Sequence, residues 1–246
     1  MPQAKPMINN QNSRKFIKVL LFTFLLLLIA HLTALVLKFK IMPESNFAER
    51  LDQFLNFDRE VNFPTYYNAI LLFLSAQTFL LIAYQNTNTK FYFKTYWYIL
   101  SFVFLLLSID EFVRIHEWFI EWTPRLFGVG GTGILKFAWI IPYGIFVILF
   151  GLYSIKFLRS LEKSFQKGYL ICSALFVLAT IGIESLGGIG YEQNNDSRSF
   201  EYLLFYTTLE ESMEMLSLIL VLHYNLKFHI DYNSALAHKS LTLPLR

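Results

Sequence analysis

The sequence predicts an all-α integral membrane bundle of six transmembrane helices. Of its 246 residues, 55% are hydrophobic and only 16% are charged, and the mean hydropathy is +0.44. These values lie outside the usual range of water-soluble domains. Several apolar runs are also long enough to cross a hydrocarbon core of about 30 Å. The short alternating strands of outer-membrane barrels are not seen, so composition and pattern exclude a soluble enzyme, a disordered protein and a barrel.

The first apolar run follows a basic N-terminal segment, as in signal peptides. It is longer than a typical signal core and no convincing cleavage site follows it, so we expect a retained helix. Five further runs of near-crossing length follow, separated by short polar linkers. The expected spans of this single membrane domain, residues 1–246, are 17–38, 67–85, 95–117, 134–155, 168–187 and 201–226.

The largest segment expected outside the membrane is residues 39–66. Within it Phe47, Leu51, Phe54 and Leu55 recur at helical spacing among charged residues. An amphipathic pattern of this kind predicts a helix that lies on the membrane surface.

Basic residues predict the orientation of the bundle. Thirteen of the 21 Lys and Arg residues lie in the N-terminal segment, the loops 86–94 and 156–167, and the C-terminal tail. With six spans these segments share one side, so both termini are expected to be cytoplasmic and the protein to reside in the inner membrane. Sixteen of the 18 acidic residues lie in the outer segments or inside the helices. A surplus of carboxylates on the outer side favours cation binding there.

The sequence gives little support for binding partners other than the lipid bilayer. The lipid bilayer is the one partner that the composition requires, and nothing favours nucleic acid. The single cysteine, Cys172, lies inside an apolar run, which excludes an intramolecular disulfide and a cysteine-based metal cluster.

Three of the expected spans carry carboxyl groups deep in the membrane. A charged side chain at such depth costs kilocalories unless it is paired, and it usually marks a functional interior. Arg114 is the only arginine beside these acids. Several of them must therefore be protonated or neutralised by a cation. The acids are Asp110, Glu111, Glu117, Glu184, Glu210, Glu211 and Glu214.

Helical spacing tests whether these acids could share a site. At about 100° per residue, Glu210, Glu211 and Glu214 occupy one face of the last span. Arg114 is placed to pair with Asp110 or Glu117. His116 lies about 140° from Glu111 on a straight helix, so joint action of these two requires a break, a bulge or a helix end.

Carboxylates and a histidine from several helices of a bundle are the ligands of di-iron and di-manganese sites. A Glu-His set also binds zinc and activates water. The usual Glu-x-x-His spacing is absent. Two alternatives stay open, namely a relay for protons or cations and structural pairing of protonated acids.

Three blocks carry a resemblance to a known group. They are FDREVNFPT at 57–65, SIDEFVRIHE at 108–117 and EESME at 210–214. Together they resemble an uncharacterised family of bacterial multi-pass membrane proteins with FDxExNxPT, SxDExxxxHE and EExxE blocks. The resemblance draws attention to Glu60 and Asn62, which precede the second span at the outer mouth. The alternative for Asn62 is a cap on that helix.

The sequence as a whole predicts a metal-dependent membrane enzyme, an oxidoreductase or a hydrolase, acting on a lipid-soluble substrate. Iron or manganese is expected ahead of zinc. A proton- or cation-coupled transporter and a non-catalytic membrane subunit are the alternatives. The expected metal ligands are Glu111, Glu184, Glu211, Glu214 and His116; the supporting residues or alternative ligands are Glu60, Asp110, Arg114, Glu117 and Glu210.

Overall fold

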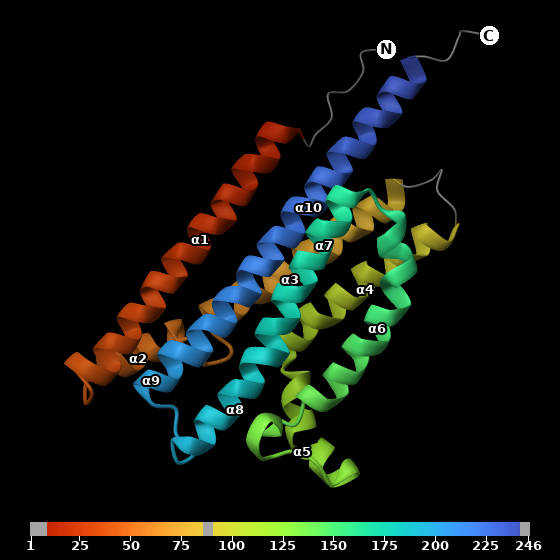
Figure 1. Cartoon of the computed structure of the whole chain (residues 1–246). Helices are drawn as coiled ribbons and strands as arrows, with labels where there is room; N and C mark the ends of the chain where they lie inside the picture. Colours follow the sequence, from red (N-terminus) through yellow and green to blue (C-terminus); the bar gives the residue numbers. More distant parts are fainter. Residues whose placement is uncertain (1–8, 86–90, 242–246) are drawn as a thin grey trace.

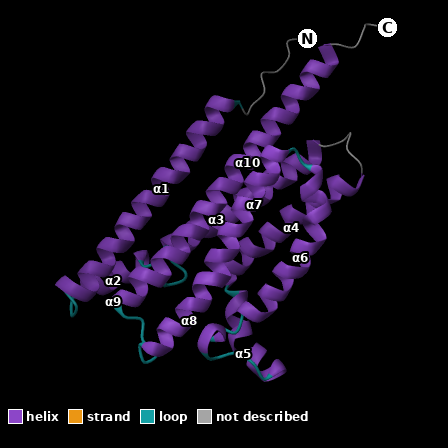
Figure 2. Ribbon diagram, in the orientation of Figure 1, coloured by secondary structure: helices purple, strands orange, loops and turns teal. Residues whose placement is uncertain are grey.

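The computed structural model describes residues 9–85 and 91–241. In this part of the chain every regular element is helical and none is a strand (Figure 2), which confirms the all-α class. Lys5, Lys90 and Arg246, which enter the orientation argument, lie outside the described residues. The helices are α1 (Asn10–Val36), α2 (Asn46–Leu55), α3 (Phe63–Gln85), α4 (Phe91–Val113), α5 (Ile115–Phe127), α6 (Ile140–Ser160), α7 (Lys163–Val177), α8 (Glu184–Gln193), α9 (Phe200–Tyr202) and α10 (Thr208–Leu241).

Three π-helical turns and one 3₁₀ turn interrupt or link these helices. The π-helical turns are η1 (Leu37–Ile41), η3 (Leu178–Ile183) and η4 (Leu203–Thr207), and the 3₁₀ turn is η2 (Gly133–Leu135). Each π-helical turn redirects the side chains that follow it, and such turns are frequent at functional sites.

The long helices run side by side as a bundle (Figure 1). The beginning of α1 and the end of α10 lie at the same end of the molecule, whereas α2, α5, α8 and α9 gather at the opposite end. We call this second end the short-helix end. Three segments that are distant in the sequence therefore meet there: the loop before α3, the loop after α4 and the connection into α10.

Within the described residues, five helical segments are long and apolar enough to cross a membrane. They are Asn10–Ile41, Phe63–Gln85, Phe93–Val113, Ile140–Ser160 and Lys163–Gln193. The expected sixth span, 201–226, is not among them. Its helix α10 has three glutamates in its first two turns and His223, Asn225 and Lys227 after its apolar stretch. This helix packs against α1, α3 and α7, and its three glutamates are half-buried, whereas His223 and Lys227 are exposed.

Most helix boundaries also differ from the expected spans. The helices expected to begin at 17, 67 and 134 begin at Asn10, Phe63 and Ile140, and two further differences lie near the acids. The expected span 95–117 ends at Val113, because Arg114 adopts a left-handed conformation with φ +60° and a separate helix begins at Ile115. The expected span 168–187 continues to Gln193 through the η3 turn. In the segment 39–66, α2 occupies residues 46–55 and buries Ala48 and Asp52.

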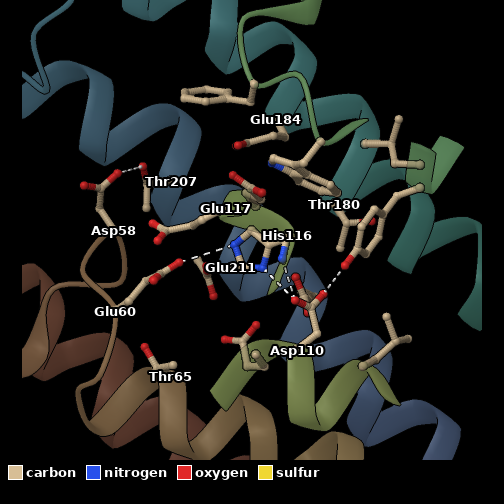
Figure 3. A pocket seen from close by; sticks show the side chains of 18 of the residues that line it. Asp58, Glu60, Thr65, Asp110, His116, Glu117, Thr180, Glu184, Thr207 and Glu211 are labelled. Atoms are coloured by element: carbon tan, nitrogen blue, oxygen red, sulfur yellow. Dashed lines mark hydrogen bonds and ion pairs between the residues drawn. The ribbon is translucent and has the colours of Figure 1, made fainter. Parts of the chain in front are cut away.

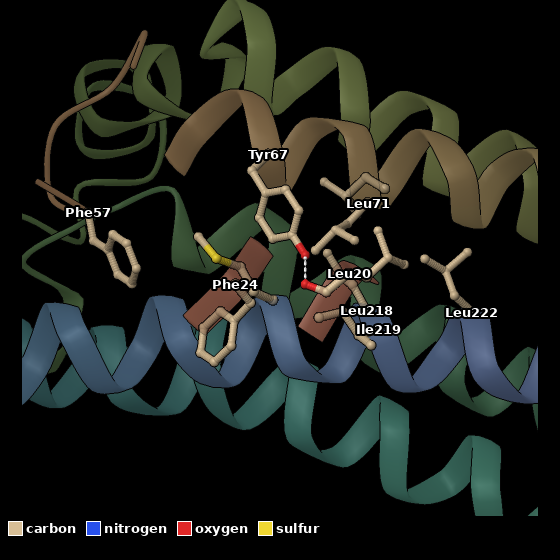
Figure 4. Close-up of a cluster of buried hydrophobic side chains, with 10 residues drawn as sticks. Leu20, Phe24, Phe57, Tyr67, Leu71, Leu218, Ile219 and Leu222 are labelled. Atoms are coloured by element: carbon tan, nitrogen blue, oxygen red, sulfur yellow. Dashed lines mark hydrogen bonds between the residues drawn. The ribbon is translucent and has the colours of Figure 1, made fainter. Parts of the chain in front are cut away.

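The main apolar core joins α1, α3 and α10 (Figure 4). Leu20 and Phe24 of α1 meet Leu71 of α3 and Leu218 and Leu222 of α10. The Tyr67 hydroxyl donates a hydrogen bond to the Leu20 carbonyl at 2.6 Å, so the one polar group in this cluster is satisfied.

A second, aromatic core fills the bundle nearer the end where α1 begins. Phe79 of α3, Tyr96 and Trp97 of α4 and Phe157 of α6 pack around the buried Cys172. The Trp97 and Phe157 rings meet edge to face at 4.9 Å between centroids. Because this cluster fills one half of the bundle, a polar interior has room only in the other half, toward the short-helix end.

Candidate functional site

A cavity of about 240 Å³ lies inside the bundle, and its lining residues from the loop before α3, from α5 and from α8 place it toward the short-helix end. Its walls come from the loop before α3 and from α3, α4, α5, α6, α7, α8 and α10. Nine carboxylic side chains line it: Asp58, Glu60, Asp110, Glu111, Glu117, Glu184, Glu210, Glu211 and Glu214. Figure 3 shows several of them, with Glu184, Glu117 and Glu211 arranged around the space that His116 also faces.

The break at Arg114 brings His116 into this cavity. Asp110 stabilises the break, because its Oδ1 accepts the backbone N–H of His116 at 2.7 Å and lies 3.2 Å from ring Nδ1. The other oxygen of Asp110 accepts the Tyr143 hydroxyl at 2.6 Å. Glu111 and His116 can face one site only if the helix is broken between them, and the structure contains this break. Asp110, from the same sequence block, stabilises it.

Both ring nitrogens of His116 are engaged by carboxylates. Nε2 lies 3.3 Å from Glu60 Oε1, and Nδ1 faces Asp110. Burial by itself would lower the pKa of His116, but the hydrogen bonds to Asp110 and Glu60 outweigh it and raise the pKa to about 10. These contacts favour the protonated form of His116 and hold its ring between two acids.

Arg114 does not line the cavity but lies at its edge, where it contacts two of the lining acids. Its Nε lies 3.1 Å from Glu60 and its Nη1 lies 3.3 Å from Glu117. Arg114 and His116 together account for Glu60, Asp110 and Glu117.

Asp58 and Arg198 form a second ion pair at the cavity wall. The Thr207 hydroxyl also donates to Asp58 at 3.2 Å. Burial raises the pKa of Asp58, and the adjacent Arg198 and Thr207 act in the opposite direction. This pair joins the loop before α3 to the connection before α10. Sequence reasoning missed Arg198, which lies in a loop with no charged motif around it.

Five of the nine acids that line the cavity lack a cationic partner among the described residues: Glu111, Glu184, Glu210, Glu211 and Glu214. Asn68 of α3 donates to Glu214 at 2.9 Å and also hydrogen-bonds the carboxyl of Glu111. The carboxyls of Glu184 and Glu210 hydrogen-bond each other, which requires a proton between them. Glu184 directly follows the η3 turn, which sets its direction.

The structure thus brings together all but one of the residues expected at the site, and Arg114 contacts two of them from outside. It does not arrange them as a preformed metal centre, because no three His, Cys, Asp or Glu side chains of the described residues are placed to hold one ion. Asn68, Tyr143 and Trp139 were missed. Asn68 alone gave a signal, as an amide in an apolar span.

Asn62 and Glu60 of the block at 57–65 have different roles. Asn62 Oδ1 accepts the backbone N–H of Thr65 at 3.1 Å and caps α3, and its amide donates to the Asn56 carbonyl at 2.7 Å. Glu60 faces the cavity and contacts both Arg114 and His116 (Figure 3).

Comparison with known proteins gives one match. Residues 19–228 match the family model described as Domain of unknown function (DUF8692). The chain belongs to this family. The DUF8692 match spans every residue that lines the cavity. No curated protein and no solved structure matches the chain.

Proposed function

We propose that this multi-pass membrane protein is a metal-dependent enzyme that acts on a lipid-soluble substrate in the acidic cavity. The observation that carries this proposal is the set of five acids without a cationic partner around one cavity. In a medium of low dielectric constant, so many carboxylates need protons or a bound cation to coexist.

Glu111, Glu211 and Glu214 are the ligands that we propose, with Glu184 and Glu210 completing the set. Carboxylate oxygens are hard ligands and suit iron(II) and manganese(II). They also bind zinc, which takes fewer ligands. The buried Oδ1 of Asn68 accepts no hydrogen bond in the described part of the chain, although the amide nitrogen beside it holds Glu111 and Glu214. An orphaned oxygen at this position suits a cation or a protonated carboxyl.

His116 then has a different role from the one expected from the sequence. Because two acids engage its nitrogens, we assign it to hold Glu60 and Asp110 in place and to carry a proton at the cavity edge. A bound metal would supply Lewis acidity or redox chemistry, and the choice between hydrolase and oxidoreductase follows from which ion binds.

Elemental analysis of the purified, folded protein tests this proposal. We expect about one or two equivalents of iron, manganese or zinc, as mononuclear and dinuclear carboxylate sites hold. Glu214→Gln and Glu111→Gln should lose the metal, and Glu162→Gln, at an exposed helix cap outside the cavity, should retain it. A folded wild type that holds no metal after addition of each of the three ions would overturn the proposal.

Proton-coupled transport is the second candidate, and the Glu184–Glu210 contact favours it. Two carboxyls that share a proton form an element of a relay. In reconstituted vesicles, proton flux that Glu184→Gln abolishes would favour the transporter, and metal bound without flux would favour the enzyme.

A further inference from the structure

The cavity has a polar half and an apolar half. Six of the apolar side chains that line it make up the half that we call apolar: Leu72, Leu107, Phe146, Val147, Phe176 and Ile181. Further apolar lining residues come from the loop before α3, from α5 and from the segment before α6: Phe57, Ile120, Phe137 and Trp139. On α4 and through η3, Leu107 and Ile181 precede the acids Glu111 and Glu184 by about one helical turn. On α6 the apolar positions follow Tyr143. The apolar half therefore lies deeper in the bundle than the acids.

The wall that α6 contributes is thin. Along this helix only Ile140 and Phe157 are buried, and they lie near its two ends. Between them, a Cβ atom added at Gly144 or Gly151 would meet no atom within 4 Å. Phe146 lines the cavity and yet has 45% of its surface exposed. Single side chains of α6 thus separate the apolar half of the cavity from the surroundings of the bundle.

The cavity is too small for a whole lipid. Its 240 Å³ equals the volume of about eight water molecules in the liquid. Pockets that enclose a drug-sized ligand measure about 300–1,000 Å³. A membrane lipid could place only its polar end and the first part of its chain inside, and the rest of the chain would have to leave through a wall.

We propose that the cavity takes the polar end of a membrane amphiphile that enters sideways past the middle of α6, with its hydrocarbon chain extending between Val147 and Phe176 into the bilayer. The polar end is one that donates hydrogen bonds, such as an alcohol or an amine, because the surrounding carboxyls are acceptors. The chemistry at that end rests on the proposed function, whereas the lateral path rests on the walls of the cavity alone.

Photo-crosslinking tests the path directly. The probe is a long-chain alcohol with a diazirine in the middle of its chain, added to the protein in lipid nanodiscs, with crosslinks mapped by mass spectrometry. We expect crosslinks at Phe176 and Ile181, which face the cavity. Crosslinks confined to outward positions such as Leu149, which is 62% exposed, would overturn the lateral path.

A matched pair of variants sharpens the test. Val147→Trp places a large ring inside the apolar half, and we expect it to abolish the Phe176 and Ile181 crosslinks. Ile148→Trp adds the same ring one position along α6, where the side chain is 63% exposed, and should retain them. Equal maps for both folded variants would overturn the proposal.

Metal content measured on the same samples separates the two proposals. Metal without cavity crosslinks would overturn the lateral path and leave the enzyme proposal standing. Cavity crosslinks without metal would support the path and overturn the metal-dependent enzyme.

Discussion

Asp110 accepts the backbone N–H of His116 at 2.7 Å across the break between α4 and α5. The same carboxylate contacts the His116 ring and the Tyr143 hydroxyl. One side chain therefore positions groups of both α5 and α6 and stabilises the break before α5. Removing its charge should weaken the start of α5 and the placement of His116 together.

Asp110→Asn therefore tests the positioning role. We expect a loss of about 1–3 kcal/mol in stability, as for a buried hydrogen bond to a charged group. Metal affinity should fall by about 10–100-fold if Asp110 supports the ligands. Thermal unfolding in detergent and metal titration measure the two effects. Glu121→Gln on α5, whose side chain is 71% exposed, is the matched control and should change neither.

Arg114 has a left-handed backbone, with φ +60° and ψ +47°. A non-glycine residue there costs about 1–2 kcal/mol, which glycine avoids. Both Arg114→Gly and Arg114→Ala lose the ion pairs to Glu60 and Glu117. We expect the glycine variant to be the more stable of the two by about 1 kcal/mol. The opposite order, which is normal inside a helix, would contradict the left-handed assignment.

His31 joins α1 to the loop before α3 and to α10. Its Nδ1 accepts the backbone N–H of Phe57 at 3.1 Å, its Nε2 lies 2.9 Å from the Thr208 hydroxyl, and its ring stacks on Phe57. The ring is fully buried. His31→Ala should destabilise the protein by about 2–4 kcal/mol, because it leaves a cavity and an unpaired amide. The exposed His223, changed to Ala, should have little effect in the same unfolding assay.

Gly168 and Gly151 should respond oppositely to alanine. A Cβ atom at Gly168 would lie 2.3 Å from the Tyr224 ring, so α7 and α10 would have to separate. A Cβ atom at Gly151 would meet nothing within 4 Å. We expect Gly168→Ala to lower the melting temperature and Gly151→Ala to leave it unchanged or raise it, since alanine is favoured over glycine in helices by about 1 kcal/mol. Equal responses would contradict the close α7–α10 approach.

Glu49 on α2 offers a test by pH. The hydrogen bond from Lys38 holds the pKa of Glu49 below its ordinary value of 4.5, with Arg59 adding to the effect. A lowered pKa means that the ion pair contributes stability above pH 4.5 and loses it as the pH falls through the folded-state pKa. The melting temperatures of wild type and Glu49→Gln should differ at pH 7 and converge below pH 4.5. A difference that stays constant across this range would contradict the ion pair.

The helical class and the gathering of the acids were predictable from the sequence. Apolar runs of crossing length are read directly from residue order, and spacing placed Glu210, Glu211 and Glu214 on one helix face. The count of spans was not predictable in the same way. The three glutamates at the start of α10 are half-buried and line an interior cavity, and hydropathy cannot show what surrounds a helix.

Residue order by itself determined that carboxyl groups lie within a membrane bundle, because each local run fixes its own helix. Only the tertiary structure decided how they pair. The break at Arg114 turned His116 toward Glu60, a loop brought Arg198 to Asp58, and an amide of α3 bridged Glu111 and Glu214. Those contacts join segments up to 146 residues apart, and the packing of whole helices, rather than local preference, sets such distances.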